Sequence, residues 1–467
     1  MNKMALTDSD DAAELSADAP EFPGDRPKDN ASQVEHDAWR SAFEVWREWR
    51  LIKLSSCLVW TKSDSPQLIS NTSNAAAFLR LHPDWHNVMA YDEFRHTALL
   101  TGAIPGTPEA LGRFEGRAVS DTDFAAAQEW FQKNGMPRMP KQAVADAMDL
   151  VCHENKADPL RQHVEECARN WDGTNRIHRL FQDYFVATEQ NAYTKELGEK
   201  VLMTLVLRAL HPGAFQKMVP ILEGKQDIGK SKGIAALCPN PEWFGDSLPT
   251  IHSKDASSYL RGMFIVEIAE LSATKRADID DLKSFITRSV ERYRPAYGRK
   301  EVEEPRRCMF WGTTNRNDYL RDETGNCRFY PVSLVAVNVN NIAVDRDQLL
   351  GEAAHLLKEA LQSNASWWEF SEAATAILES ERRARDEDHP WTGIVLRYVE
   401  NLDEVAIPAI LEASEHATPS GLGIARERYE RKHSMAVAGI LKAHDWVRSG
   451  KFTSGNWKGQ ARYVRGV

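Results

Sequence analysis

The chain has 467 residues, of which 42% are hydrophobic and 27% charged, and a formal net charge of -10. At about 100–200 residues per domain, this length predicts two to four domains that can each bury a core. Residues 1–30 lack the apolar segment of a signal peptide, and no run of about 18 uncharged apolar residues predicts a membrane span. The negative balance argues against a histone-like DNA coat, but it leaves room for a local basic channel.

Six scattered cysteines are typical of reduced thiols rather than of a disulfide framework. We therefore expect a cytoplasmic protein.

The N-terminal part is predicted to be a tail followed by helices. Residues 1–35 hold nine acidic residues against three basic ones, which predicts a disordered, solvated tail. Residues 36–195 are predicted to form a helical domain, because Trp39, Phe43, Trp46 and Leu51 recur at helical spacing. Further helices are expected at 74–81, 121–134, 139–154, 159–169 and 196–210.

From Met218 the pattern changes to short apolar runs that alternate with helices. The runs are residues 219–222, 263–268, 308–313 and 329–335, and the following helices are expected at 349–362 and 371–385. Apolar runs separated by helices predict a mostly parallel sheet covered on both faces. We expect an α/β domain over residues 196–385.

The C-terminal part, residues 390–467, follows a predicted linker at 385–390. Helices are expected at 392–400, 407–416 and 435–444, and a hairpin from strands at 446–451 and 460–464. This order is typical of a winged-helix module. Residues 426–467 carry ten Lys or Arg against three acids, which suits DNA, although winged helices also bind proteins.

A phosphate-binding loop is the strongest motif in the sequence. Residues 224–231 fit G-x-x-x-x-G-K-[ST], between a predicted strand and a predicted helix. Backbone N–H groups of such a loop surround phosphate oxygens, Lys230 reaches the β- and γ-phosphates, and Ser231 binds Mg²⁺. The predicted nucleotide-binding residues are Gly224, Gln226, Asp227, Ile228, Gly229, Lys230 and Ser231. A plain glycine turn is the alternative.

Two carboxylates follow the second buried strand of this domain. Glu267 and Glu270 are expected at its carboxyl end, where they would hold Mg²⁺ and polarise the attacking water. Glu267 is predicted to share the metal with Ser231. Which glutamate is the base stays open, and both could be surface residues.

Polar residues after the third strand could complete the site. Asn315 could orient the attacking water or sense the γ-phosphate, or it could simply end the strand. Arg321 and Arg328 are candidates for an arginine that a neighbouring subunit supplies in ring-shaped ATPases. Either could be an ordinary surface arginine.

Together these segments resemble the virulence-associated protein E family of phages and mobile elements, which is similar to superfamily 3 and primase-associated helicases. The resemblance rests on residues 224–231, 264–271, 310–315 and 322–329, with a specific match at 293–299, and extends over residues 70 to 340. It implies an AAA+-like core, ATP hydrolysis and a homo-hexameric ring that acts on DNA during replication, in the cytoplasm of a bacterial or phage-infected host cell. The family pattern has two arginines where this chain has Cys327 and Arg328, which makes Arg328 the better candidate for action in trans.

A basic segment between the second and third strands is the predicted DNA contact. Arg292, Arg294, Arg299 and Lys300 alternate with Tyr293 and Tyr297. Guanidinium groups can hold phosphates and tyrosines can stack on bases, at about 1–3 kcal/mol per base. The alternative is that neighbouring glutamates neutralise these bases. The predicted DNA-binding residues are Arg292, Arg294, Tyr297, Arg299 and Lys300.

A zinc site and a polymerase active site are not expected. Cys152, His153, His163 and Cys167 lack the C-x-x-C spacing of a zinc site, so no structural zinc is expected. The first 200 residues show no paired-aspartate polymerase pattern, so a primase would be a separate protein.

The sequence therefore predicts an ATP-dependent DNA helicase or translocase with ATP and Mg²⁺ as cofactors. The alternatives are an ATP-binding switch or DNA-binding regulator that does not unwind, and a small-molecule kinase that shares the loop.

Overall fold

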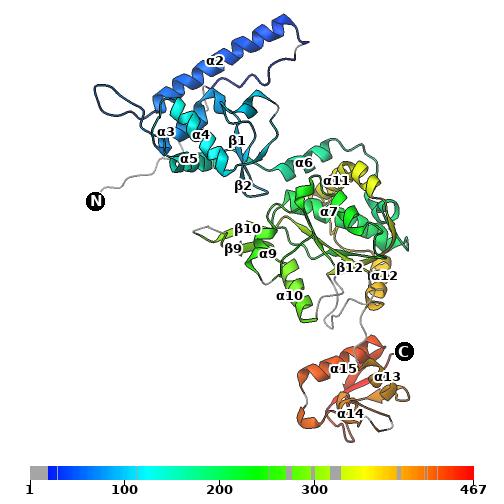
Figure 1. Ribbon diagram of the computed structural model, residues 1–467. Helices are drawn as coiled ribbons and strands as arrows, with labels where there is room; N and C mark the ends of the chain where they lie inside the picture. Colours follow the sequence, from blue (N-terminus) through cyan, green and yellow to red (C-terminus); the bar gives the residue numbers. More distant parts are fainter. Residues whose placement is uncertain are drawn as a thin grey trace. The chain divides into compact units, whose positions relative to one another are not determined.

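The computed structural model describes residues 19–28, 30–112, 114–251, 253–269, 276–295, 300–315, 328–385, 391–414, 416–417, 419–428 and 430–466. The chain divides into two compact units, residues 1–162 and 163–467. Figure 1 shows the first unit in blue to cyan and the second from cyan to red. The fold mixes helices with several sheets, as the sequence predicted.

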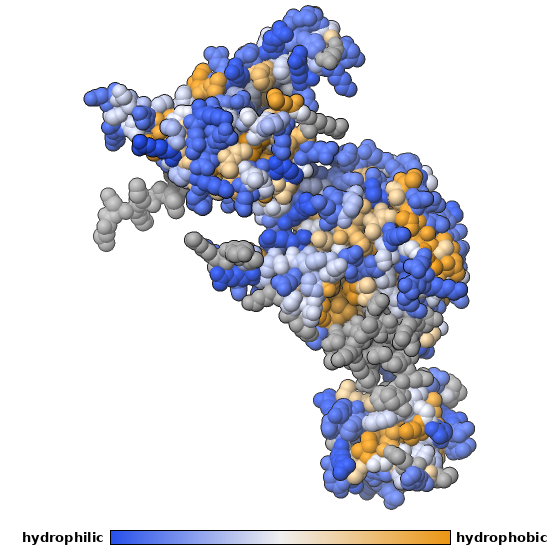
Figure 2. Space-filling view, viewed as in Figure 1, coloured by the Kyte–Doolittle hydropathy of each residue, from blue (hydrophilic) through white to orange (hydrophobic). Residues whose placement is uncertain are grey.

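The first unit opens with the long helix α2 (Gln33–Cys57), which starts at a Ser32–Glu35 capping box. The last three residues of the predicted tail are therefore helical. Trp46 and Leu54 are its buried residues, whereas Leu51, expected on the buried face, is 37% exposed. Most of the surface of α2 is hydrophilic in the view of Figure 2. Phe22, from the predicted tail, packs edge-on against Trp46 with ring centroids 4.9 Å apart.

Helices α3 (Thr72–Leu81), α4 (Asp121–Lys133) and α5 (Lys141–Glu154) form the core of this unit, close to their predicted positions. The short strands β1 (Met89–Asp92), β2 (Thr97–Leu100), β3 (Arg117–Ala118) and β4 (Lys156–Ala157) form a sheet of order β3-β2-β1-β4. The sequence analysis expected only helices here. Strands of two to four residues are too short to show a period-2 pattern.

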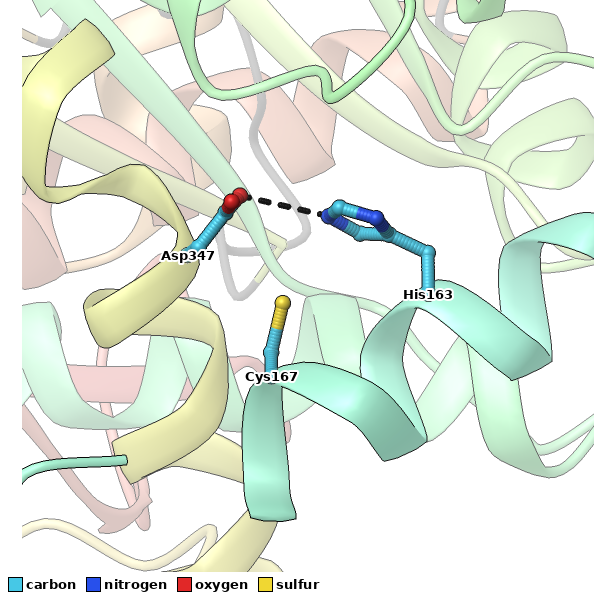
Figure 3. A group of neighbouring side chains, drawn as sticks. All are labelled: His163, Cys167 and Asp347. Atoms are coloured by element: carbon cyan, nitrogen blue, oxygen red, sulfur yellow. Dashed lines mark hydrogen bonds and ion pairs between the residues drawn. The ribbon is translucent and has the colours of Figure 1, made fainter. Parts of the chain in front are cut away.

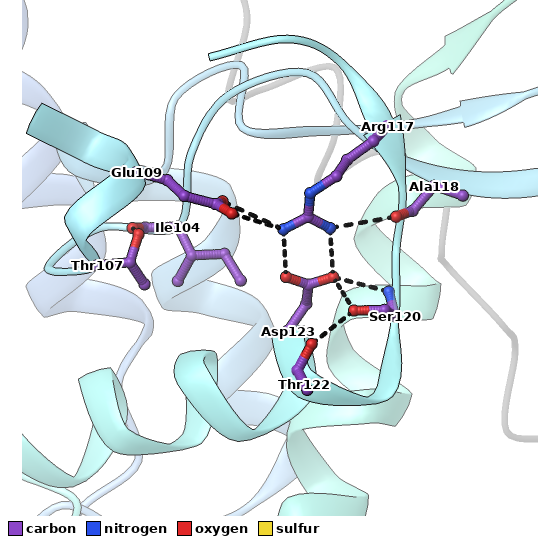
Figure 4. A network of polar contacts seen from close by, with 8 residues as sticks. All are labelled: Ile104, Thr107, Glu109, Arg117, Ala118, Ser120, Thr122 and Asp123. Atoms are coloured by element: carbon purple, nitrogen blue, oxygen red, sulfur yellow. Dashed lines mark hydrogen bonds and ion pairs between the residues drawn. The ribbon is translucent and has the colours of Figure 1, made fainter. Parts of the chain in front are cut away.

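A polar network fixes the start of α4 (Figure 4). The Arg117 guanidinium donates two hydrogen bonds to the Asp123 carboxylate, at 2.7 and 2.8 Å, and one to Glu109 at 3.1 Å. Asp123 is 4% exposed and also accepts bonds from the Ser120 backbone N–H and hydroxyl. Burial alone would raise the pKa of Asp123, but the bonds from Arg117 and Ser120 outweigh it and lower the pKa to about 2.

The second unit contains the main sheet, of order β5-β12-β6-β11-β8-β7. All its neighbours are parallel except β5, which is antiparallel to β12. The strands are β5 (Phe185–Ala187), β6 (Val219–Glu223), β7 (Phe244–Gly245), β8 (Ile265–Ile268), β11 (Met309–Thr314) and β12 (Phe329–Val337). The four runs predicted as strands are β6, β8, β11 and β12.

Consecutive residues of β11 make aromatic contacts on opposite faces of the sheet. Phe310 packs on Phe285 of α10 (Arg276–Ile286), with centroids 5.8 Å apart. Trp311 turns to the other face and packs on Phe185 at 5.7 Å. Because successive side chains of a strand point to opposite faces, each face has its own aromatic contact. Further helices of this part are α6 (Pro159–Arg169), which begins in the first unit, α7 (Ala192–Leu210), α8 (Lys230–Ala236), α9 (Lys254–Tyr259), α11 (Val339–Gln362) and α12 (Glu372–Arg383).

The C-terminal segment has its own core, built around Val395, Ile410, Val437 and Leu441. Its elements are α13 (Thr392–Val399), β13 (Glu404–Val405), α14 (Ile407–Glu412), α15 (Arg431–Ala443), β14 (Trp446–Lys451) and β15 (Ala461–Arg465). The strands form an antiparallel sheet of order β13-β15-β14. The predicted order of three helices and a terminal hairpin is present, with one added short strand. Among the described residues, no helix has the length and apolar character that a membrane crossing requires.

Replacing Asp123 with Asn should destabilise the start of α4, because the substitution removes the ion pair with Arg117 and leaves one oxygen to accept the bonds that two carboxylate oxygens accept. We expect the opening free energy of α4 amides in the full chain to fall by about 2 kcal/mol at pH 7. The folded pKa of about 2 lies below the usual value near 3.9, so this stabilisation is present above pH 4 and lost as the pH falls toward 2. Hydrogen exchange measures both effects.

Asp121→Asn is the matched control, because Asp121 is exposed and lies in the same helical turn. Equal losses in the two variants would show that only the charge near the helix N-terminus matters.

Candidate functional site

The predicted phosphate loop lies between β6 and α8, at the carboxyl end of β6. Gly224 has a φ of 151°, and a Cβ added there would lie 2.8 Å from the Leu334 carbonyl oxygen. Asp227 and Gly229 also have positive φ values, of 64° and 93°. This run of left-handed positions turns the backbone back onto itself, which explains the glycines of the motif. Gln226 and Asp227 are exposed, and Ile228 is half-buried.

Lys230, the first residue of α8, points back into the loop. Its Nζ donates to the carbonyl oxygens of Gly224 and Lys225, at 2.7 and 2.9 Å, and to Asn315 Oδ1 at 2.9 Å. The residue is only 8% exposed. Burial lowers the pKa of the ammonium group, while the carboxylates of Glu267 and Asp227 oppose the shift. The positively charged ammonium group of Lys230 is therefore held at the opening of the loop.

Glu267 connects the loop to the next strands. Its Oε1 accepts hydrogen bonds from the hydroxyls of Ser231 at 2.7 Å and Thr313 at 2.6 Å. Glu267 is 2% exposed and lies within β8, one residue before its end. The sequence analysis placed it at the strand edge and missed Thr313, whose only signal was a polar residue late in an apolar run.

Asn315 follows β11 directly and is exposed. The structure thus brings together four predicted residues, Lys230, Ser231, Glu267 and Asn315, at one edge of the sheet. The strand order explains why: β11 lies between β6 and β8, and all three are parallel. Glu270 lies outside the described residues.

Arg328 lies at the amino ends of the parallel strands, opposite to the loop. Its carbonyl oxygen accepts a bond from the Val219 N–H at the start of β6, whereas the loop begins after the end of β6. Five residues of strand separate the two edges by about 16 Å. Arg328 is half-buried, and its Nε finds no hydrogen-bond partner among the described residues. Arg328 therefore cannot reach the loop of its own chain through a side chain.

The predicted DNA-binding segment contains a hairpin of β9 (Val290–Tyr293) and β10 (Val302–Pro305). Arg292, Arg294 and Lys300 are exposed. Arg292 pairs with Glu303 on the opposite strand, with Nε and Oε1 3.0 Å apart. Tyr293 is buried and donates to Glu304 Oε2 at 2.8 Å, so it does not present a ring for bases. Tyr297 and Arg299 lie outside the described residues.

A buried ion pair that the sequence analysis missed lies directly before the loop. Glu223, the last residue of β6, accepts bonds from Arg385 Nη2 and from the Ser333 hydroxyl, both at 2.6 Å. Arg385 also contacts Glu381 at 2.6 Å. Glu223 is 0% and Arg385 6% exposed. In the sequence, the feature that indicated this ion pair is a charged residue, Glu223, at the end of an otherwise apolar strand.

The cysteines and histidines weighed for zinc fall into two groups. Cys152 and His153 lie on α5 of the first unit, and Cys152 is part of its core. His163 and Cys167 lie on α6.

These features define an α/β protein whose phosphate-loop motif, buried acid and strand-end amide lie at one edge of a mostly parallel sheet. The model of the virulence-associated protein E-like domain matches residues 164–387. The match to this domain family confirms the resemblance over residues 164–387. The match begins at the second unit rather than near residue 70.

Solved structures of the C-terminal region of NrS-1, residues 305–718, are similar to 81% of this chain and 96% of their own. Two apo structures share 14% and 12% sequence identity with it, at TM-scores of 0.38 and 0.36. A likeness of this degree does not bear on activity. The comparison with curated proteins found no match.

Replacing Arg385 with Met should leave the Glu223 carboxylate buried without its cation. We expect a loss of about 3–5 kcal/mol, and therefore a transition of the second unit that is lower by roughly 5–15 °C in calorimetry of the full chain. Arg383→Met is the matched control, because Arg383 is exposed at the end of α12, two residues before Arg385, and its ion pair with exposed Glu379 is long, at 3.9 Å.

The double variant Glu223→Gln/Arg385→Met should recover much of the loss, since it leaves no unpaired charge. A double variant as unstable as Arg385→Met would contradict the ion-pair explanation.

Proposed function

We propose that the chain hydrolyses ATP with Mg²⁺ at the phosphate loop. The observation that carries the proposal is that Lys230 and Ser231, at the start of α8, are hydrogen-bonded to Asn315 and Glu267 at the carboxyl ends of β11 and β8. Lys230 would exchange its loop carbonyls for the β- and γ-phosphates. Ser231 and Glu267, already hydrogen-bonded to each other, would hold Mg²⁺ directly and through water. Asn315 would orient the attacking water or sense the γ-phosphate.

The proposed work of this ATPase is DNA unwinding or translocation in the replication of a phage or mobile element. The family match supports a role of this kind. Exposed Arg294 and Lys300, beside the β9–β10 hairpin, would contact phosphates. In the C-terminal segment, proposed to be a winged-helix module, Arg448, Lys451 and Lys458 are exposed and would add a second DNA contact. A primase would be a separate partner.

The ring assembly is proposed from the position of Arg328. An arginine at the edge opposite to the loop can act on phosphates only in a neighbouring chain. In a closed ring each loop would face the Arg328 edge of the next subunit, which would stabilise charge on the γ-phosphate. We propose a homo-hexamer with an AAA+-like core on this basis and on the family resemblance.

An ATP-binding switch that does not unwind is the second candidate. The Arg292–Glu303 ion pair and the buried Tyr293 favour the switch, because both leave fewer groups of the hairpin available to bind DNA. Strand separation on a forked substrate distinguishes the two, since only a motor separates strands processively. A small-molecule kinase would share the loop but leave the basic hairpin without a role.

Replacing Lys230 with Ala should abolish ATP turnover, because it removes the only positive charge shown to point into the described part of the loop. The matched control is Lys232→Ala, two residues on and exposed, which should keep turnover within about twofold. Turnover of purified protein is measured with and without single-stranded DNA. Turnover retained in Lys230→Ala would overturn the ATPase proposal, and ATP binding with DNA-indifferent turnover would favour the switch.

Mixing two inactive variants tests the role of Arg328. Lys230→Ala and Arg328→Ala should each be inactive, but mixed subunits can form sites with an intact loop from one and an intact arginine from the other. At equal amounts and random assembly about one quarter of the sites would be complete. ATP turnover that reappears on mixing supports action in trans. An inactive mixture, with mixed assembly verified by mass spectrometry, would refute it.

A further inference from the structure

Three side chains outside the proposed ATP site meet between α6 and α11 (Figure 3). His163 and Cys167 lie one turn apart on α6, and Asp347 faces them from α11. His163 Nε2 is 3.2 Å from Asp347 Oδ1, and one nitrogen, sulfur or oxygen atom of each residue lies within 4.8 Å of the others. An imidazole, a thiol and a carboxylate are the donors that Zn²⁺ takes in proteins.

The two helices hold these donors at a fixed spacing. At Gly351 of α11, one turn beyond Asp347, an added Cβ would lie 2.4 Å from the Cys167 carbonyl oxygen. The backbones of α6 and α11 are therefore in direct contact beside the cluster. A tetrahedral zinc ion needs donor atoms about 3.3–3.8 Å apart. Rotation of the side chains can close that difference without movement of the helices.

The cluster is also open to an ion from one side. Cys167 is 4% exposed, whereas the His163 and Asp347 side chains are 27% and 50% exposed. The buried thiol would form the floor, and the accessible side leaves room for a water molecule as the fourth ligand.

We propose that His163, Cys167 and Asp347 bind one zinc ion, with water as the fourth ligand. The ion would link α6, whose residues from His163 onward belong to the second unit, to α11. Val339, the first residue of α11, lies beside Gly229 of the phosphate loop. A fixed α11 would therefore support the loop, but zinc binding itself does not depend on ATP hydrolysis.

The thiol proton of Cys167 and the positive charge of Arg346 both affect zinc binding. Zinc binds a thiolate, so formation of the zinc–sulfur bond releases the thiol proton to water. Arg346 Nε lies 3.1 Å from Asp347 Oδ1, and its positive charge opposes the ion. Removing this charge should strengthen binding.

The test uses the full chain after chelator treatment, with Co²⁺ as the spectroscopic probe and Zn²⁺ as the competitor. We expect one equivalent of Co²⁺ to give visible ligand-field bands and a near-ultraviolet sulfur-to-cobalt band, both removed by Zn²⁺. Cys167→Ser should lose the sulfur band, and Asp347→Asn should weaken binding by about 10-fold or more. Cys57→Ser is the control, because Cys57 is an exposed free thiol and should leave the spectrum unchanged.

Arg346→Gln should bind Co²⁺ several-fold more tightly than the parent chain. Zinc should also raise the calorimetric transition of the second unit in the parent chain and raise it clearly less in Asp347→Asn, whose folding is checked in the same scan. No bound Co²⁺ in the parent chain, or a sulfur band that survives in Cys167→Ser, would overturn the proposal.

Discussion

Parallel pairing of three strands is the constraint on which the rest of the second unit depends. Because β6, β11 and β8 run in the same direction, whatever follows their carboxyl ends arrives at one edge. Strand β11 lies between β6, which leads into the loop, and β8, which carries Glu267. Thr313 of β11 therefore reaches Glu267, and Asn315, which follows β11, reaches Lys230. With a different strand order the chain would still carry the phosphate-loop motif, but Glu267 and Asn315 would lie away from it.

The carboxylates of this site are buried, and each is stabilised in a different way. Glu267 takes two hydroxyl donors, whereas Glu223 takes a guanidinium and a hydroxyl. A buried carboxylate without such donors would cost several kcal/mol. The hydroxyl donors of Glu267 are weak enough to be exchanged for a cation, which suits a functional acid. The ion pair of Glu223 is suited to holding a strand end in place.

The sequence predicted the apolar strands, most helices and the four residues that converge at the sheet edge, because each depends on a local pattern. Thr313, Ser333 and Arg385 could not be predicted in this way, since their roles arise from contacts between strands and helices far apart in the chain. The same holds for Asp347, which joins His163 across 184 positions and turns a rejected zinc pattern into a three-residue cluster. Helix α11 starts ten residues before its predicted start because residues 339–348 are largely polar and show no apolar period. The short strands of the first unit were missed for want of length, and Glu270, Tyr297 and Arg299 lie outside the described residues.

The Glu223–Arg385 ion pair has a mechanical consequence. Arg385 lies just beyond α12, six residues before Trp391 of the C-terminal segment, and Glu223 precedes the first glycine of the loop. Tension on the polypeptide beyond Arg385 would therefore be carried across the guanidinium to the end of β6, rather than around the length of β12 and its helices. Load would then arrive at Glu223, next to Gly224, the first residue of the phosphate-loop motif, so a pull on one end of the chain could alter the loop without any change in the sheet between them.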